Sequence, residues 1–376
     1  MIKFFQKSET DKYIIIKILF IKITFKKKPR KNKPPKSNID AIVWWIPFKS
    51  LRNAVRNLLN NYTNLFNINS RNLENINYNN EIRQNITQIK QEINKLDIRN
   101  KARMQLLSMG EERIIKPIRN EKLIVSLTTY PQRIVDIDVV IFSLINQSIK
   151  PDKIILWLAY EEFPNLERDI PNHVLNLKKL GLEIEFCHNI YSYNKLIHAL
   201  EKYPNDLIVT ADDDIYYPYN WLEKLYKSYL ENPNVIHCHR AHRIIFDDKN
   251  NILPYKQWLQ EFKPKNSNPS YLNFSTGVAG TIYQHKLLHN DIFNEELFLK
   301  LCPKADDIWV WTMALLKNTK INIIDSNMSH IVDFEIGYNY YSKLVDINVV
   351  QNFNDIQLDN CFKYYGDKLK NKLFEE

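Results

Sequence analysis

Residues 207–220 read LIVTADDDIYYPYN. The apolar stretch 207–211 predicts a short buried strand, and the aspartates Asp212, Asp213 and Asp214 follow it directly. Adjacent carboxylates repel one another unless a cation lies nearby, and Mg²⁺ or Mn²⁺ binds through one or two carboxylates together with substrate phosphates. We therefore expect a divalent-cation and diphosphate site at this strand end. The alternative is an acidic turn, which aspartate also favours.

The sequence on either side of this stretch alternates between strand-like and helix-like segments. Strand-like runs cover residues 123–127, 153–158, 182–187 and 207–210, and helical patterns cover residues 135–147, 171–180 and 193–202. This alternation predicts an α/β domain with a mostly parallel sheet that is covered by helices on both faces. Ligands of such sheets bind beyond the carboxyl ends of the strands. The polar segment SLTTYPQR, which ends the first strand, should therefore lie beside the aspartates.

Charge and cysteine usage limit the class of protein. The chain has 376 residues and a net charge of +9. Residues 1–37 hold twelve Lys/Arg and two acidic residues, a net charge of +10, so the remaining chain carries −1. Because the part that carries the motifs is neutral, we expect no nucleic-acid partner. The four cysteines are scattered without a CxxC pair, which indicates a reducing, cytoplasmic compartment.

The N-terminal 50 residues form a basic, partly apolar tail. The apolar stretch 13–25 is shorter than the about 18–20 residues that span a bilayer. Seven basic residues without an acidic one follow it at 26–36. This juxtaposition favours peripheral attachment to the anionic inner face of a membrane. The alternatives are a disordered tail or a strand of the domain.

Residues 51–110 contain two short apolar tracts with heptad spacing. The apolar positions of the first are Leu51, Val55, Leu58, Tyr62 and Leu65, and those of the second are Ile82, Ile86, Ile89, Ile93 and Leu96. Tracts of this kind predict helices that pair, for example as a coiled coil that makes a homo-oligomer. An intramolecular helical hairpin and a single helix docked on the domain are the alternatives.

Glycines and basic residues outside the aspartate run are further candidates for ligand contacts. Gly277 and Gly280 in the stretch TGVAG are two of only six glycines. They predict a close backbone approach, either a loop for the donor sugar or acceptor or simply a tight turn. Lys195, Arg240 and Arg243 are candidates for neutralising a diphosphate or an anionic acceptor. Each of the three could equally be a surface charge.

Seven segments occur in order between residues 121 and 325. They are LIVSLTTYPQRI, DKIILWLAYEEFP, GLEIEFCHNIYSYNKLIHAL, LIVTADDDIYYPYNWLEKLY, IHCHRAHRI, TGVAG and CPKADDIWVW. Together they resemble bacterial family 2-like glycosyltransferases with the glycosyltransferase A fold. The segment WWIPFKSLRN at 44–53 also resembles a leader of bacterial surface-polysaccharide glycosyltransferases. The resemblance implies a nucleotide-diphospho-sugar transferase domain over 121–335, and a helical tail follows at 336–376.

The resemblance also implies a reaction and its donor site. A sugar would move from a UDP-sugar to a saccharide acceptor of surface polysaccharide or lipopolysaccharide synthesis, by direct, inverting displacement with Mn²⁺ or Mg²⁺. Asp214 would ligate the metal, and Asp212 would approach the ribose or the water shell of the metal. Thr128, Tyr130 and Arg133 would line the uridine and diphosphate.

On the acceptor side the resemblance points to Asp306 and Asp307, in CPKADDIWVW. Inverting transfer needs a base within hydrogen-bond reach of the acceptor hydroxyl. The second member of the pair, Asp307, is the implied base, with Asp306 as the alternative. Aspartate also favours helix N-caps, so we expect one of the two to cap the following helix. His330 could be a third metal ligand, although a lone histidine is more often structural.

Two other functions share parts of this pattern. A nucleotidyltransferase that makes sugar nucleotides also uses an α/β sheet and a carboxylate-bound metal, but it usually has a glycine-rich basic loop after the first strand, and SLTTYPQRI contains no glycine. A coiled-coil scaffold with an inactive transferase-like domain would not need both acidic sites. Screening UDP-sugars for metal-dependent release of UDP separates these possibilities.

Overall fold

The computed structural model describes residues 5–9, 13–18, 21–26, 76–109, 119–265, 269–324, 332–333 and 346–375, and five single residues between 53 and 61. The chain forms two compact units, residues 1–92 and 93–376. The predicted heptad tract at 51–65 lies mostly outside the described residues. Among the described residues, no helix is both long and apolar enough to cross a membrane.

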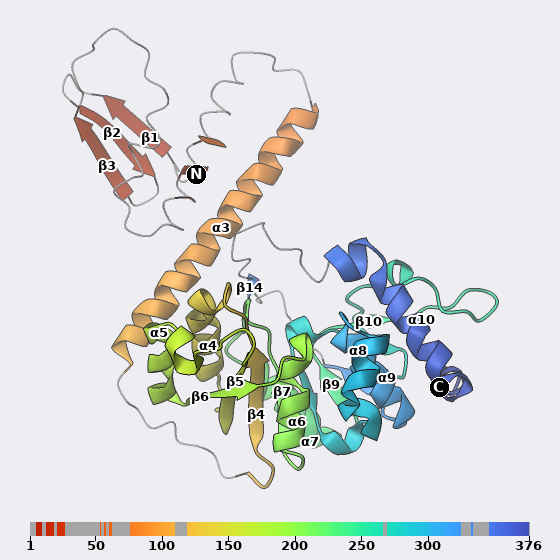
Figure 1. Ribbon diagram of the computed structural model, residues 1–376. Helices are drawn as coiled ribbons and strands as arrows, with labels where there is room; N and C mark the ends of the chain where they lie inside the picture. Colours follow the sequence, from red (N-terminus) through yellow and green to blue (C-terminus); the bar gives the residue numbers. More distant parts are fainter. Residues whose placement is uncertain are drawn as a thin grey trace. The chain divides into compact units, whose positions relative to one another are not determined.

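The N-terminal unit contains a three-stranded antiparallel sheet. Its strands are β1 (Phe5–Glu9), β2 (Tyr13–Ile18) and β3 (Ile21–Lys26), in that order (Figure 1). β2 and β3 come from the apolar stretch of the basic tail, and β-branched isoleucines favour strands over helices. The stretch therefore forms strands, although in a small sheet of its own and not in the seven-stranded sheet of the domain.

Helix α3 (Ile76–Ser108) runs without a break through the second predicted heptad tract and beyond it. Its last turns, from Ile93 on, belong to the large unit and pack on its other helices. Ala102 is buried against Val139 and Phe142, and Arg103 bonds Asp138 at 2.7 Å. Ile93, an apolar position of the tract, stays 42% exposed. The end of the tract thus belongs to a single helix docked on the domain.

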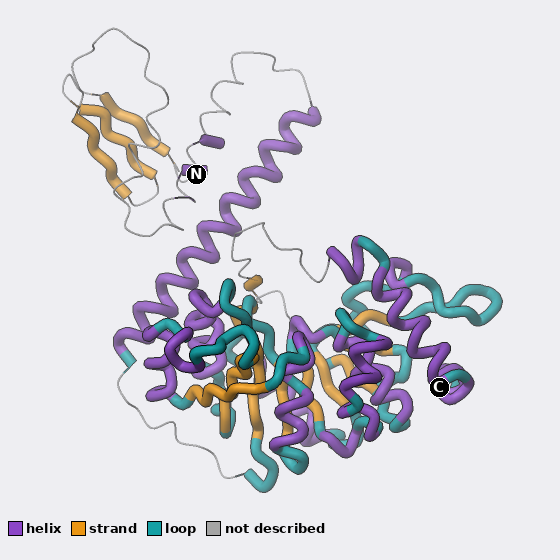
Figure 2. Tube along the Cα trace, in the orientation of Figure 1, coloured by secondary structure: helices purple, strands orange, loops and turns teal. Residues whose placement is uncertain are grey.

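The large unit is built on a seven-stranded sheet in the order β13-β9-β12-β7-β4-β5-β6, and Figure 2 draws its strands in orange between purple helices. The strands are β4 (Leu123–Thr128), β5 (Lys153–Ala159), β6 (Leu182–Cys187), β7 (Leu207–Thr210), β9 (Ile236–Cys238), β12 (Thr281–Tyr283) and β13 (Ile321–Ile323). Only β12 runs against its neighbours. The prediction of an α/β domain with a mostly parallel sheet is confirmed.

Both faces of the central strands are buried, as their continuous apolar runs predict. In β4, Leu123, Val125 and Leu127 join one core cluster, whereas Ile124 joins the other. Helices α4 (Ile137–Ile145) and α7 (Trp221–Glu231) cover the first face, and α6 (Ile197–Lys202), α8 (Glu295–Leu301) and α9 (Asp306–Leu316) cover the second. The predicted helix at 171–180 is a short α5 (Asn172–Leu175) that continues as a 3-10 turn.

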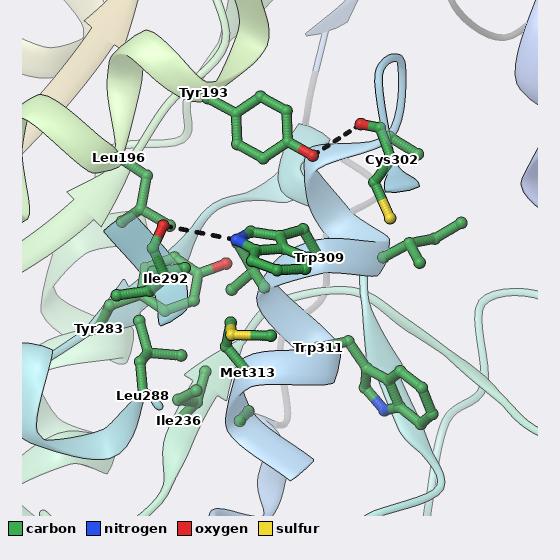
Figure 3. Packing of buried hydrophobic residues seen from close by; sticks show 14 of the residues in the cluster. Tyr193, Leu196, Ile236, Tyr283, Leu288, Ile292, Cys302, Trp309, Trp311 and Met313 are labelled. Atoms are coloured by element: carbon green, nitrogen blue, oxygen red, sulfur yellow. Dashed lines mark hydrogen bonds between the residues drawn. The ribbon is translucent and has the colours of Figure 1, made fainter. Parts of the chain in front are cut away.

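Helix α9 is buried along most of its length, from Ile308 to Leu315. Trp309 and Trp311 are each 1% exposed or less, and Figure 3 shows Trp309 between Tyr193 and Tyr283. The Trp309 indole N–H also points to the carbonyl of Ile292 at 3.4 Å. Because so large a surface is buried, the N-terminal end of α9 is held rigidly at the edge of the sheet.

The remaining elements complete the large unit. The short antiparallel pairs are β8 (Ile215–Tyr216) with β14 (Val332–Asp333) and β10 (Ala241–Arg243) with β11 (Asn273–Ser275). Helices α10 (Phe353–Tyr365) and α11 (Asp367–Leu373) end the chain. Leu358, Cys361, Leu369 and Leu373 place them in the core cluster of α9. The described part of the segment 336–376 is helical, and it is packed into the domain.

Candidate active site

The first polar cluster, around the aspartate run, lies at the ends of two neighbouring parallel strands. β4 pairs with β7 so that Ser126 lies opposite Thr210. Both strands therefore end at the same edge of the sheet. The hydroxyl of Thr129, just after β4, donates to Asp213 at 2.6 Å. Asp213 is 6% exposed, and burial raises the pKa of its carboxyl. The middle aspartate of the run is therefore directed inward.

Arg133 binds two members of the aspartate run. Its guanidinium lies 2.7 Å from a carboxylate oxygen of Asp213 and 2.8 Å from one of Asp214. It also lies 5.5 Å from the ring centroid of Tyr130. The structure thus places Arg133 on the aspartates and Tyr130 beside Arg133, and the positive charge that the run requires comes partly from Arg133 itself.

Lys195 supplies the second positive charge. Its ammonium lies 2.6 Å from Asp212 and 3.8 Å from Asp306. Burial alone would lower the pKa of Lys195, but the negative charges of Asp212, Asp306 and Asp307 outweigh it and raise that pKa well above the ordinary value. The carbonyl of Lys195 accepts a hydrogen bond from Ser126, so the residue is fixed to β4. Lys195 joins two acidic sites that are remote in sequence.

Asp306 and Asp307 open α9, and each has a different partner. Ser192 donates to Asp306 at 2.9 Å. Asp307 accepts the backbone N–H of Gly277 at 3.0 Å. The N-cap residue is Ala305, and neither aspartate side chain caps the helix. The expectation that one of the pair is a cap is wrong, because both carboxylates turn toward other segments.

Asp307 is the most strongly perturbed carboxyl of the site. Burial, and then the negative charge of Asp306, raise its pKa to about 8, although Lys195 and the N–H of Gly277 act in the opposite direction. A carboxyl with a pKa near the working pH is well suited to general-base catalysis. No pattern in the sequence indicates this shift, because it depends on how α9 is packed.

The TGVAG loop approaches Asp307 and Lys195 closely because Gly277 lacks a side chain. A Cβ on Gly277 would stand 3.3 Å from both the Asp307 carboxylate and the Lys195 ammonium. Gly280 has a φ of +93°, and a Cβ there would stand 2.4 Å from the ring of Trp221. The indole N–H of Trp221 donates to the Ala279 carbonyl at 2.7 Å. The loop is thereby held in place by α7.

Tyr217 is a positioning residue that the sequence alone presents only as one of several aromatics. Its hydroxyl accepts the backbone N–H of Asp212 at 2.8 Å and lies 3.3 Å from the carbonyl of Val278. Its ring packs on that of Trp221, with the centroids 4.2 Å apart. Tyr217 therefore couples the aspartate run to the glycine loop. The sequence signal for this role is the pair Tyr217 and Trp221, which are four residues apart and follow the aspartate run.

Three other predicted residues bond partners outside the two acidic sites. The Thr128 hydroxyl donates to the carbonyl of Trp157 at 2.9 Å. Arg240 pairs with Glu261 at 3.2 Å and donates to Thr276, the first residue of the TGVAG loop. Arg243 bonds Ser270. The histidines near these arginines are buried and bond within the core; they are His237, His239 and His242.

The donor atoms fit a divalent cation that arrives with a phosphate. In the described part of the chain, no three histidine, cysteine, aspartate or glutamate side chains gather where they could hold a metal. Asp212 and Asp214 nevertheless supply hard oxygens, and Mg²⁺ or Mn²⁺ often takes only one or two carboxylates and completes its shell from phosphate and water. His330 lies outside the described residues.

Comparison with known proteins adds little to this picture. No protein-family model matches the chain, and no curated protein matches it. Among solved structures, the crystal structure of S. aureus TarS is 16% identical over 68% of this chain, with a TM-score of 0.37. The chain spans 44% of that structure's length. A likeness this distant assigns neither a family nor an activity.

Proposed function

We propose that this protein is a glycosyltransferase that moves a sugar from a UDP-sugar to a saccharide acceptor. One observation carries the proposal: Lys195 lies 2.6 Å from Asp212 and 3.8 Å from Asp306. An aspartate run at a strand end and a buried acidic pair on a helix therefore share one edge of the sheet. Two acidic sites side by side suit a two-substrate transfer, one for the donor diphosphate and one for the acceptor hydroxyl.

The donor would bind at the aspartate run. Arg133 holds Asp213 and Asp214, and Tyr217 holds the backbone of Asp212, so these carboxylates are ordered before a ligand arrives. Such preorganisation lowers the cost of binding a charged group. A divalent cation held by Asp212 and Asp214 would offset the negative charge that builds on the departing diphosphate.

The acceptor would be activated by Asp307. Its carboxylate takes the proton of the acceptor hydroxyl while the oxygen attacks the anomeric carbon from the face opposite UDP, so the configuration inverts. A pKa of about 8 makes Asp307 a stronger base than an ordinary carboxylate. The N–H of Gly277 fixes one of its oxygens at 3.0 Å, and the other oxygen can then face the acceptor.

The cellular setting is part of the proposal. The basic segment 26–36 suits the anionic inner face of a membrane, where lipid-linked saccharides of surface polysaccharide or lipopolysaccharide synthesis are assembled. Helix α3 keeps part of its apolar stripe exposed, Ile93 among it. We propose that pairing of this stripe between two chains makes a homo-oligomer.

The experiment is a screen of UDP-sugars for release of UDP in the presence and absence of Mn²⁺. The proposal expects at least one donor to be consumed, EDTA to stop its consumption and Asp214→Ala to abolish it while circular dichroism stays unchanged. Asp248→Ala, an aspartate outside the site in a surface loop, is the matched control and should retain activity. Release of pyrophosphate from UTP plus a sugar phosphate, without release of UDP, would instead identify a nucleotidyltransferase.

A further inference from the structure

The turn that carries Lys195 begins with a residue that the proposed reaction leaves unused. Tyr191 has a φ of +61°, in the left-handed region that bulky L-residues rarely adopt. It is also 56% exposed. A tyrosine in this position gains little from burial and is unfavourable for the backbone. Burial of the side chain therefore gives little reason for a tyrosine here.

The strained conformation is fixed by two asparagines. The N–H of Tyr191 donates to the side-chain carbonyl of Asn189 at 2.9 Å. The N–H of Ile190 donates to the side-chain carbonyl of Asn194 at 2.9 Å, and Asn194 is itself buried. Strain that the surroundings hold in place in this way is characteristic of functional sites.

The same turn is fastened to the segment that leads into α9. The Tyr193 hydroxyl donates to the carbonyl of Cys302 at 2.7 Å (Figure 3), and Ser192 donates to Asp306 at 2.9 Å. Lys304 lies between these two anchors, and its ammonium is 5.1 Å from the ring centroid of Tyr191. The exposed ring is thus held next to the acidic pair.

The backbone of Lys304 is fixed by two hydrogen bonds. Its N–H donates to Gln357 at 2.8 Å, and its carbonyl accepts from Asn348 at 2.7 Å. Among the described residues, no carboxylate forms a salt bridge with its ammonium, unlike that of Lys195. A half-exposed ring and an ammonium are therefore presented together on rigid supports.

We propose that Tyr191 and Lys304 form a pyranose-binding subsite for the acceptor. An exposed aromatic ring stacks on the C–H face of a sugar, and an ammonium donates to a ring hydroxyl or to the carboxylate of an acidic sugar. Because Ser192 links this turn to Asp306, a sugar on Tyr191 lies on the side of the acidic pair. The assignment to the acceptor rests on the proposed function.

The test is saturation-transfer NMR on the full-length protein. The probes are the methyl pyranosides of glucose, galactose, N-acetylglucosamine and glucuronic acid. At least one should bind, with saturation concentrated on the protons of one ring face. Tyr191→Ala should weaken that binding by about five-fold, the effect of one lost stacking contact, and Tyr191→Phe should keep it. Tyr364→Ala removes an equally exposed tyrosine, 57% accessible on α10, and should change nothing.

A second variant separates a binding role from a structural one. Asparagine tolerates the left-handed region far better than tyrosine does, so Tyr191→Asn should melt at the same temperature as the wild type or higher and still lose the saccharide. If Tyr191→Asn or Tyr191→Ala lowers the melting temperature and leaves saccharide binding intact, Tyr191 is structural and the subsite is overturned. The subsite is also overturned if none of the four glycosides binds the wild-type protein.

Calorimetry with UDP and Mn²⁺ keeps this result distinct from the proposed function. UDP should bind the wild type, Tyr191→Ala and Tyr191→Asn equally, because the donor contacts lie at the aspartate run. If UDP binds and the glycosides do not, the subsite is wrong and the donor site stands. If a glycoside binds through Tyr191 and UDP does not bind, the subsite stands and the proposed reaction is wrong.

Discussion

At the scale of single residues, the candidate site combines carboxylates with basic side chains that pair with them. Five carboxylates of the two acidic sites surround two cations, Arg133 and Lys195. Of these five carboxylates, Asp307 alone forms no salt bridge with a described residue. The negative charge of its neighbour Asp306 raises the pKa of Asp307 further. The reactivity of Asp307 therefore depends on its neighbours, and this gives a prediction about pH.

The rate should follow the ionisation of Asp307. As the unprotonated base is needed, kcat/KM should rise with pH and level off above about 8, the pKa of Asp307. Asp306→Asn removes a negative charge that raises this pKa, so the midpoint of the profile should move to lower pH. Steady-state kinetics from acidic to alkaline pH, with a buffer of constant ionic strength, measure both midpoints. An unchanged midpoint in Asp306→Asn would mean that another group titrates.

Two of the three described glycines with positive φ, Gly280 and Gly366, separate steric from backbone effects. Gly280 has a φ of +93°, and a Cβ added there would stand 2.4 Å from the Trp221 ring, whereas Gly366 has a φ of +60° and nothing within 4 Å of that position. Gly280→Ala should therefore lower the free energy of unfolding by roughly 1–3 kcal/mol more than Gly366→Ala does, the range for overpacking. Urea denaturation of both variants measures the difference. Equal losses would show that Trp221 moves aside without cost.

At the scale of elements, the sequence predicts those strands whose apolar pattern is visible within a few neighbouring residues. The strands β4, β5 and β7 are predicted because each is a nearly continuous apolar run, such as LIV at 207–209, and β6 is predicted because apolar residues alternate with Glu183 and Glu185. The three-residue strands β9 and β12 are too short for a pattern to be visible. The sequence therefore does not predict β12, the one antiparallel strand of the seven-stranded sheet. The contact of Lys195 with Asp306 was missed as well, because it forms only when a turn and α9 meet on the folded sheet.

The docking of α3 depends on a few polar contacts. Arg103 bonds Asp138 at 2.7 Å and Asp136 at 2.8 Å, and Asp138 is 4% exposed. Arg103→Ala should lower the free energy of unfolding by about 1 kcal/mol, a modest value because Arg103 is partly exposed to water. It should also speed amide exchange over residues 93–108.

Lys101→Ala is the matched control for this measurement. Lys101 pairs with Asp97, and both side chains are largely exposed, at 71% and 55%. Exposed pairs contribute little, so amide exchange in α3 should stay as in the wild type. If Arg103→Ala and Lys101→Ala behave alike in hydrogen-exchange mass spectrometry, α3 is held by its apolar contacts alone.

At the scale of the whole molecule, the excess positive charge and the candidate active site lie in different units. The net charge of +10 lies in residues 1–37, within the N-terminal unit 1–92. All residues of the candidate site lie in the large unit, apart from His330, which is outside the described residues. Attachment and catalysis should therefore be separable, and this too can be tested.

Deletion of residues 1–37 should leave transfer to a soluble acceptor unchanged and weaken binding to anionic vesicles. Each basic residue near an anionic surface contributes about 1 kcal/mol, and salt should weaken the binding of the intact chain in the same way. Cosedimentation with phosphatidylserine vesicles, and with neutral phosphatidylcholine vesicles as the control, measures the effect. Unchanged sedimentation after the deletion would rule out this segment as the anchor.

The central claim is that the aspartate run serves the donor and Asp307 serves the acceptor. Asp307→Asn keeps the shape of the side chain and removes the base. It can be compared with Asp306→Asn, which alters the neighbouring carboxylate that bonds Ser192. Both variants leave Asp212 and Asp214 untouched.

The deciding measurement is UDP-sugar affinity by calorimetry together with steady-state turnover for both variants. We predict that Asp307→Asn binds the donor within a few-fold of the wild type and that its kcat falls by roughly 10²–10⁴, the usual effect of a lost general base. Asp306→Asn should keep most of its turnover above the midpoint of its pH profile. Normal turnover of Asp307→Asn, whatever Asp306→Asn does, would contradict the assignment of Asp307 as the base.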